Sequence, residues 1–220
     1  MDYETAQRHL QTSKLMGVDF LPVCNSPQCA EPSSQQSMLD ALRVEHETSC
    51  PHCTTVTGHK QIVFGTGNSS ASLMFIGEAP GAEEDEQGIP FVGAAGQKLD
   101  QIIEAIGVHR EDVYIANVLK SRPPDNRTPL PSEVALCGPY LKKQIEIIKP
   151  KVIITLGSPA TKYILDTNQG ITRLRGTWGT YNNIPVLPTY HPAYLLRNYT
   201  TEIRRQVWDD MQQVISKINQ

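Results

Sequence analysis

The stretch best suited to chemistry follows the apolar segment 73–76. A turn with glycines at 77 and 81 comes next and contains Glu78, and Phe91 follows as a lone aromatic residue between a proline and a glycine. Glycines let the backbone approach a flat ligand closely and leave amide N–H groups free to donate. The loop is acidic where a phosphate site would be basic, and it lacks the GxGxxG and Gly-Lys-Ser/Thr signatures. It therefore predicts a site for a neutral or cationic ligand.

Two further polar side chains follow predicted strands. Asn117 stands near the carboxyl end of the apolar segment 113–119, and His191 enters a tight turn fixed by Pro192. The asparagine could simply cap the turn that follows it, and a single histidine is more often structural than catalytic. Taken alone, each residue leaves both interpretations open.

The cysteines suggest a metal site. Five cysteines, an odd number, favour metal ligands or buried thiols over disulfides in a reducing compartment. Cys50 and Cys53 form a Cys-x-x-Cys pair, which is half of a tetrahedral site. Zinc held by Cys24, Cys29 and this pair would leave Cys137 as a buried thiol, and that alternative stays open.

These residues require an α/β fold to position them. Apolar segments at 73–76, 113–119 and 151–156, and another ahead of His191, are typical of buried strands, and segments 97–106, 132–149 and 201–218 have the spacing of helices. The alternation predicts a three-layer α/β/α domain around a central, mainly parallel four-stranded sheet. A ligand is then expected at the carboxyl ends of the strands.

The first residues differ in composition from the rest. Segment 25–34 is rich in turn residues and segment 37–47 has helical character. We expect residues 1–48 to form a helical or partly disordered extension and residues 49–220 to form the catalytic domain. Within that domain, Arg173 and Arg175 are expected to flank a strand, and residues 181–184 to form a hairpin turn.

Charge and hydropathy narrow the function classes. The 220 residues carry a net charge of −3, so no global basic field attracts nucleic acid, and any DNA contact must use a local patch. The sequence has no secretory signal and no apolar run long enough to span a bilayer, which predicts a cytoplasmic protein without a membrane partner.

Taken jointly, the glycine turn with Phe91, the segment around Asn117 and the segment 186–197 (VLPTYHPAYLLR) resemble the motifs of family 4 uracil-DNA glycosylases, bacterial and archaeal enzymes with an iron–sulfur cluster. The resemblance covers roughly residue 49 to the C-terminus. It implies a DNA repair enzyme that flips uracil out of single- or double-stranded DNA, hydrolyses its N-glycosidic bond and leaves an abasic site. It also implies a monomer, with a sliding clamp as a candidate partner.

The resemblance assigns roles around the base. Asn117 would read the N3–H and O4 edge of uracil through its amide, and Phe91 would stack on the ring. His191 would stabilise the charge that develops at O2. Glu78 would position water or stabilise an oxocarbenium-like sugar, and Glu84 would lie beside C5 and exclude the thymine methyl group. The backbone of Gly77, Glu78 and Ala79 would hold the edge of the base.

Contacts with DNA are implied for Arg122, Arg127, Ser158, Leu195, Leu196 and Arg197. The first two lie on a proline-stiffened loop, which could equally be a rigid connector, and would meet phosphates. The serine begins a helix whose N-terminus could hold a phosphate. The two leucines would fill the gap left by the flipped nucleotide, and the last arginine would meet an adjacent phosphate.

The resemblance further implies a 4Fe–4S cluster on Cys50, Cys53, Cys137 and a fourth cysteine at position 121, which is Ser121 in this chain. A serine hydroxyl keeps its proton and is a poorer iron ligand than a thiol. Three outcomes stay open: a cluster with three cysteines or an alkoxide, a cluster completed by Cys24 or Cys29, or no cluster. We expect an iron–sulfur site on the three cysteines with labile occupancy.

Two other functions stay open beside this one, and the sequence argues against a third. A catalytically reduced protein of the same fold would bind uracil or single-stranded DNA without turnover, but Glu78, Asn117 and His191 argue against it. A nucleotide hydrolase of another class would need a basic or metal-bearing phosphate site, which the acidic loop does not offer. A covalently crosslinking relative would need an inserted basic loop before the histidine, and residues 185–190 leave no room for one.

Overall fold

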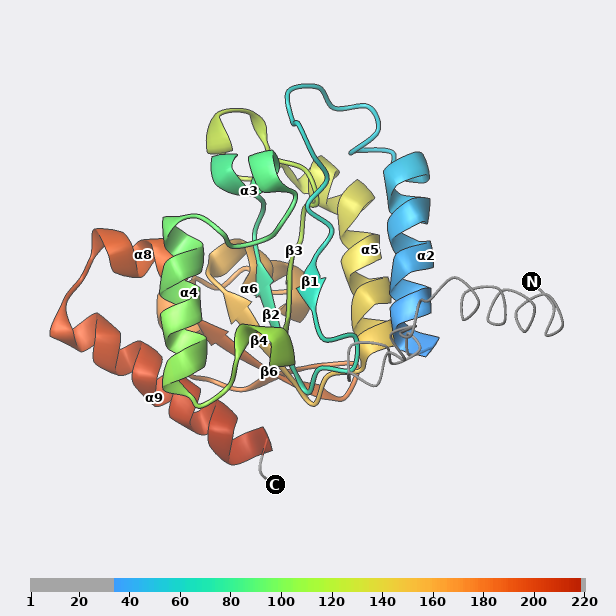
Figure 1. The fold of residues 1–220 in the computed structure, drawn as a ribbon. Helices are drawn as coiled ribbons and strands as arrows, with labels where there is room; N and C mark the ends of the chain where they lie inside the picture. The colour runs from blue at the N-terminus through green and yellow to red at the C-terminus, as the bar shows by residue number, and fades with distance from the viewer. Residues whose placement is uncertain (1–33, 219–220) are drawn as a thin grey trace, which may run out of the picture. The chain divides into compact units, whose positions relative to one another are not determined.

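The computed structural model describes residues 34–218, and a sheet of the predicted strands lies at its centre (Figure 1). Four parallel strands run in the order β3 (Tyr114–Asn117), β2 (Leu73–Gly77), β4 (Val152–Leu156) and β6 (Ile184–Thr189). Two short antiparallel strands, β1 (Thr66–Gly67) beside β3 and β5 (Gly179–Tyr181) beside β6, extend it to six strands within residues 34–218. The mainly parallel sheet is confirmed, with these two edge strands added to the predicted four.

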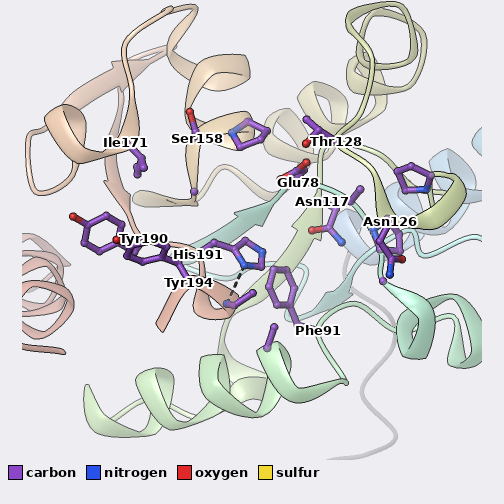
Figure 2. Close-up of a pocket in the computed structure, with 18 of the residues that line it drawn as sticks. Glu78, Phe91, Asn117, Asn126, Thr128, Ser158, Ile171, Tyr190, His191 and Tyr194 are labelled. Atoms are coloured by element: carbon purple, nitrogen blue, oxygen red, sulfur yellow. Dashed lines mark hydrogen bonds between the residues drawn. The ribbon is translucent and has the colours of Figure 1, made fainter. Parts of the chain in front are cut away.

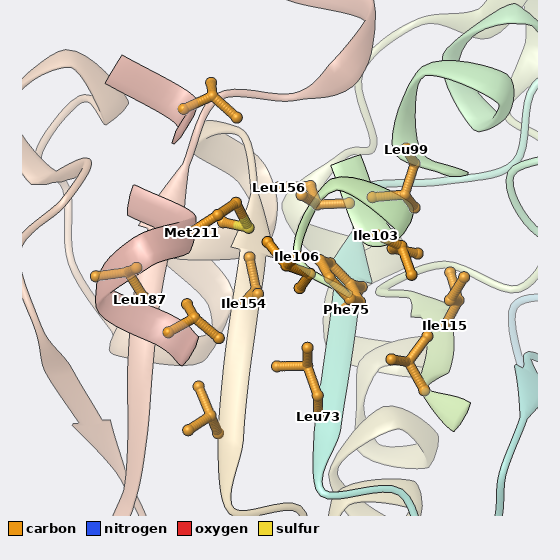
Figure 3. Packing of buried hydrophobic residues seen from close by; sticks show 14 of the residues in the cluster. Leu73, Phe75, Leu99, Ile103, Ile106, Ile115, Ile154, Leu156, Leu187 and Met211 are labelled. Carbon is orange, nitrogen blue, oxygen red and sulfur yellow. The ribbon is translucent and has the colours of Figure 1, made fainter. Parts of the chain in front are cut away.

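The central strands are mostly apolar and buried because both faces of the sheet are covered. All five residues of β2 and all five of β4 are buried. Since successive side chains of a strand point to opposite faces, Leu73 and Phe75 enter one core cluster, whereas Met74 and Ile76 enter the other. Figure 3 shows the first cluster closing around Phe75. Each such side chain contributes about 1.5–3 kcal/mol by leaving water.

Helices form the two outer layers, so the predicted α/β/α architecture is confirmed (Figure 1). On one face, α4 (Ala94–Ala105) and α9 (Thr201–Ile218) bury Leu99, Ile103 and Met211. On the other, α5 (Pro131–Ile148) and α6 (Ser158–Leu165) bury Leu141 and Ile164. The short helices are α3 (Ala82–Gln87), η2 (Arg110–Asp112), η3 (Pro124–Asn126), α7 (Ile171–Leu174) and α8 (Pro192–Arg197).

Near the end of the chain, one local prediction is confirmed and one is wrong. Asn182 and Asn183 adopt positive φ angles of 47° and 66° and join β5 to β6, as a tight hairpin requires. The segment between Arg173 and Arg175, however, belongs to helix α7 rather than to a strand. Its backbone bonds close locally, because the Arg175 amide donates to Ile171 at 2.8 Å.

Helix α2 (Ser34–Ser49) contains the segment predicted to be helical at 37–47. It packs against α5 and buries Leu39 and Leu42. Residues 1–33, which include Cys24 and Cys29, lie outside the described residues. Among the helices of residues 34–218, none combines the length and apolar character needed to cross a membrane.

Candidate active site and cysteine cluster

A cavity of about 620 Å³ opens where the parallel strands end (Figure 2). It brings together the glycine turn after β2, the end of β3, the start of α6 and the turn into α8. Most of the residues predicted around the base line it, although they are up to 113 positions apart in the chain: Glu78, Ala79, Glu84, Phe91, Asn117 and His191, with Ser158, Arg127 and Arg197 at the same cavity. The geometry expected from strand order is therefore realised.

Asn117 is the most tightly enclosed polar residue of the cavity. It pairs with Gly77 across β3 and β2, and its side chain is only 1% exposed. A Cβ atom on Gly77 would lie 2.3 Å from Asn117 Oδ1 and 2.5 Å from Phe91 Cζ, so only glycine leaves room for both side chains. The Asn117 Oδ1 atom has no hydrogen-bond partner among the described residues. A buried amide oxygen in this state is ready for a donor from a ligand.

Phe91 is held in an unfavourable backbone conformation beside this amide. Its φ angle is 53°, in the left-handed region that costs a bulky residue about 1–3 kcal/mol. Gly96 in α4 makes the conformation possible, since a Cβ there would lie 2.0 Å from the Phe91 carbonyl oxygen. The Phe91 and His191 rings lie 5.6 Å apart, centroid to centroid, and are tilted by 31°. The two rings thus stand on the same side of the cavity (Figure 2).

His191 precedes α8 as its N-cap residue, and its Nδ1 atom accepts a hydrogen bond from the Ala193 amide at 3.1 Å. An accepting Nδ1 places the imidazole proton on Nε2. Burial lowers the pKa of His191 to about 4, helped by the positive charge of Arg197 and opposed by Glu84. The side chain is therefore a neutral Nε2–H donor at physiological pH.

The two carboxylates of the first loop differ in their surroundings. Burial raises the pKa of Glu78, and a hydrogen bond with Thr128 partly offsets this effect. Glu84 instead accepts from three backbone amides, those of Gly81 at 3.1 Å and of Val92 and Gly93 at 2.9 Å each. It ties the start of α3 to the segment after Phe91. Its predicted place beside uracil C5 stays a prediction.

The residues predicted to meet DNA fall into exposed and buried groups. Leu196 is 43% exposed, and Arg197 is exposed at the cavity. Leu195 is 3% exposed and packs into the core, because neighbouring residues of α8 point in different directions. Of the two leucines predicted to fill the gap, Leu196 alone presents its side chain to the surface. Ser158 begins α6 at the cavity.

The two arginines of the proline-rich loop already have partners. Arg127 forms a two-pronged ion pair with Glu133, at 2.6 and 2.8 Å, and this pair lowers the pKa of Glu133 to about 2. Glu133 also accepts the Leu130 amide at 2.7 Å and so caps α5. Arg122 donates from Nε to Asn126 Oδ1 at 2.8 Å. Contacts of these arginines with phosphates stay predictions.

A second group of functional residues lies between α2 and α5. Cys50, Cys53 and Cys137 are buried, with the sulfur atoms of Cys53 and Cys137 3.5 Å apart. Their three sulfur atoms and one ring nitrogen of His46 all lie within 4.8 Å of one another. Hydrogen bonds from Cys137 and Cys53 lower the pKa of Cys50, while the pKa of Cys137 is raised by its bonds to the other two thiols and by burial. Thiolate and imidazole are donors suited to zinc or iron–sulfur centres, so the group is compatible with a metal site.

His46 was missed in the sequence although a signal was present. It stands one helical turn before Cys50, which gives the spacing His-x-x-x-Cys-x-x-Cys. Ser121 does lie in the group, where its Oγ atom accepts a hydrogen bond from Cys53 Sγ at 3.3 Å. Thr128 and Tyr194, which also line the cavity, carried no such signal.

Comparisons with known proteins place this geometry in a family. The family model of the uracil DNA glycosylase superfamily matches residues 64–212. The chain is 45% identical to the type-4 uracil-DNA glycosylase of Thermotoga maritima over 178 residues, 79% of this chain and 92% of that protein. It is 46% identical to that of Saccharolobus solfataricus over 182 residues, 79% of this chain and 83% of the relative. The chain therefore belongs to the uracil DNA glycosylase superfamily and, within it, to the type-4 uracil-DNA glycosylases.

Proposed function

We propose that this protein excises uracil from DNA by hydrolysing its N-glycosidic bond, which leaves an abasic site. The observation that carries the proposal most directly is the unpartnered Oδ1 atom of Asn117 in a cavity of about 620 Å³, which has ample room for a nucleobase. An amide presents one acceptor and one donor, which match N3–H and O4 of uracil. Cytosine offers the reversed pattern at these positions, so the same side chain also discriminates.

Binding requires the nucleotide to leave the stack, at a cost of a few kcal/mol that is smaller for mispaired or single-stranded uracil. We infer that Phe91 stacks on the flipped ring and that the backbone of Gly77 to Ala79 closes its edge. Leu196 is exposed and placed to fill the vacated position in a duplex, while Ser158 and Arg197 are placed for the flanking phosphates. Arg122 and Arg127 would contribute further phosphate contacts once their present partners are exchanged.

Bond cleavage transfers the electron pair of the C1′–N1 bond to the uracil ring, and the negative charge collects at O2. The Nε2–H group of His191 is the donor proposed for that oxygen, and a preorganised donor of this kind contributes about 3 kcal/mol to the transition state. A neutral imidazole serves here, because its Nδ1 atom is fixed as an acceptor. Water then bonds to C1′ and releases a proton, for which the carboxylate of Glu78 is the proposed acceptor.

The cysteine group is proposed to hold an iron–sulfur centre of the 4Fe–4S type, supported by three buried thiols in one place. Such a centre would fasten the 50–53 turn and α5 together, and no step of the reaction needs it. Action as a monomer, a sliding clamp as a partner and a cytoplasmic location belong to the same proposal, and they rest on the sequence alone.

The test is excision from oligonucleotides that contain one uracil, thymine or cytosine, read by alkaline strand cleavage in single- and double-stranded form. Cleavage is expected at uracil only, and Asn117→Ala should abolish it. Asn68→Ala is the matched control, because this exposed asparagine follows β1 near the amino-terminal end of β3, the end opposite to Asn117. Folded wild-type protein that leaves uracil intact would overturn the proposal in favour of a non-catalytic binder.

A further inference from the structure

His46 is an imidazole buried beside three thiols without the partners that such a group normally has. The side chain is fully buried, its Nε2 atom lies 3.6 Å from Cys137 Sγ, and its Nδ1 atom has no hydrogen-bond partner among residues 34–218. A buried polar atom left without a partner costs about 1–3 kcal/mol. The Nε2 atom, rather than the unpartnered Nδ1, faces the thiols, so its lone pair is placed for a metal ion shared with them.

We propose that His46 is the fourth ligand of the metal centre, completing a Cys₃His set with Cys50, Cys53 and Cys137. This ligand set adds His46 to the metal centre proposed for the three cysteines, and it does not depend on uracil excision. It assigns to this chain a ligand set that differs from four cysteines.

The local fold delivers the ligands in a fixed arrangement. His46 lies in the last turn of α2, and the helical hydrogen bonding continues into the cysteine turn, because the Cys50 amide donates to the His46 carbonyl at 3.0 Å and the Thr54 amide to that of Cys50 at 3.1 Å. Cys137 reaches the same point from α5. The His46 ring is held edge-on against Tyr140, at 4.7 Å between centroids and 89° between planes. A metal ion here would join α2 to α5.

Ser121 takes a different role in this arrangement. It is fully buried, and its Oγ atom accepts a hydrogen bond from Cys53 Sγ at 3.3 Å. Its hydroxyl is a hard, protonated group and a poor partner for a soft metal. The neighbouring backbone amide of Lys120 is a donor, and it donates to Cys137 Sγ at 3.3 Å. Residues 120 and 121 therefore support ligating sulfurs through hydrogen bonds.

The spacing of the four ligand atoms bears on the kind of centre. Thiolates around one zinc ion, with Zn–S bonds of about 2.3 Å, stand about 3.8 Å apart. The ligand atoms here lie within 4.8 Å of one another, which is the spacing of a single ion. In a 4Fe–4S cluster each thiolate binds a different iron, so the same ligands would have to move apart. The inference concerns the ligand set, and metal analysis decides which of the two centres it holds.

The experiment compares anaerobically purified full-length variants by iron, zinc and sulfide content and by X-ray absorption at the metal edge. The wild-type protein should contain about one zinc ion, or about four irons with matching sulfide, and one nitrogen ligand. His46→Ala removes a ligand and should weaken metal binding more than about 100-fold, whereas Ser121→Ala removes only a hydrogen bond to a ligating sulfur and should weaken it about 10–100-fold at most. His46→Ala combined with Ser121→Cys should restore metal binding with sulfur ligands only.

Two control variants distinguish the loss of a ligand from a failure to fold and from ligation by Cys24 or Cys29. If His46→Ala fails to fold, His46→Cys should bind metal through four sulfurs and lose the nitrogen signal. Cys24→Ser with Cys29→Ser should change neither content nor ligation. Full metal content with an unchanged nitrogen signal in His46→Ala, loss of metal from the Cys24 and Cys29 variant, or a wild-type protein without metal would each overturn the inference, whatever happens to uracil excision.

Discussion

Two buried carboxamide side chains in neighbouring parts of this molecule differ in whether their polar atoms have hydrogen-bond partners. Gln144, in the layer behind the cysteine group, donates to Phe64 O at 3.0 Å and to Tyr114 Oη at 3.2 Å, and accepts from Lys120 Nζ at 2.6 Å. Asn117, equally buried, leaves its Oδ1 atom without a partner. Buried polar groups that only support a fold are normally satisfied, so the exception marks where a ligand is expected.

Lys120 connects the two regions. Its ammonium group donates to the Asn117 carbonyl at 2.9 Å as well as to Gln144, and its amide donates to Cys137 Sγ. The segment from Asn117 to Lys120 thus carries the proposed base-reading amide at one end and a support for the proposed metal ligands at the other. A variant of Asn117 should therefore lower excision, whereas a variant of Gln144 should lower the free energy of unfolding.

Asn117→Ala should have the largest effect, and it should fall on activity alone. Loss of both hydrogen bonds to the base should lower kcat/KM about 10³-fold, or about 4 kcal/mol. The free energy of unfolding should stay unchanged or rise slightly, because an unsatisfied oxygen is removed. Single-turnover excision and urea denaturation measure the two quantities. A large loss of stability would mean that Asn117 is a structural amide like Gln144.

Gln144→Met should give the opposite result. The near-isosteric side chain removes one of the two acceptors of the Lys120 ammonium and the side-chain donor to the Phe64 carbonyl, so the free energy of unfolding should fall by about 3 kcal/mol. Excision per folded molecule at low temperature should stay within a few-fold of wild type. Urea denaturation with parallel single-turnover assays tests this, and unchanged stability would remove the contrast between the two amides.

The sequence predicted the parallel sheet and most of the cavity because both depend on local pattern. Strand β2 is apolar throughout, and Glu78, Asn117 and His191 each follow a strand, so parallel order alone brings them together. The proposed ligand role of His46 had only its spacing from Cys50 as a local signal, because no local pattern specifies how α2 packs against α5 through Leu39 and Leu42.

Other details needed the three-dimensional structure for similar reasons. Whether Leu195 or Leu196 faces the solvent is decided by how α8 lies on α4, and Glu84 is recruited by amides that lie beyond its own helix. The pairing of Arg127 with Glu133, by contrast, had a signal in the sequence. A glutamate at the third position of a helix that begins with proline commonly caps that helix.

The protonation of His191 gives a pH-dependent test of the cavity that contains Asn117, with a smaller expected effect. With its pKa near 4, the imidazole should be about nine-tenths neutral at pH 5, whereas an ordinary value of about 6.5 would leave about 3% neutral. Because the folded-state pKa is below the unfolded one, the associated stability is present above about pH 6.5 and is lost as pH falls toward 4. Nitrogen-15 NMR titration should find this pKa, with the proton on Nε2 at pH 7. Titration near 6.5 would contradict the buried neutral donor.

Leu196→Ala should have the smallest effect and should depend on the DNA. An exposed side chain that fills a vacated base position matters only in a duplex, so excision from double-stranded DNA should fall about 3–10-fold while single-stranded excision and stability stay unchanged. Leu195→Ala is the matched variant one position away, and it should cost about 2–4 kcal/mol of stability because that side chain lies in the core. Equal losses on both substrates would place Leu196 outside the flipping step. Together the two variants test whether, within one short helix, the exposed side chain serves DNA binding and the buried one serves packing, a division like that expected between Asn117 and Gln144.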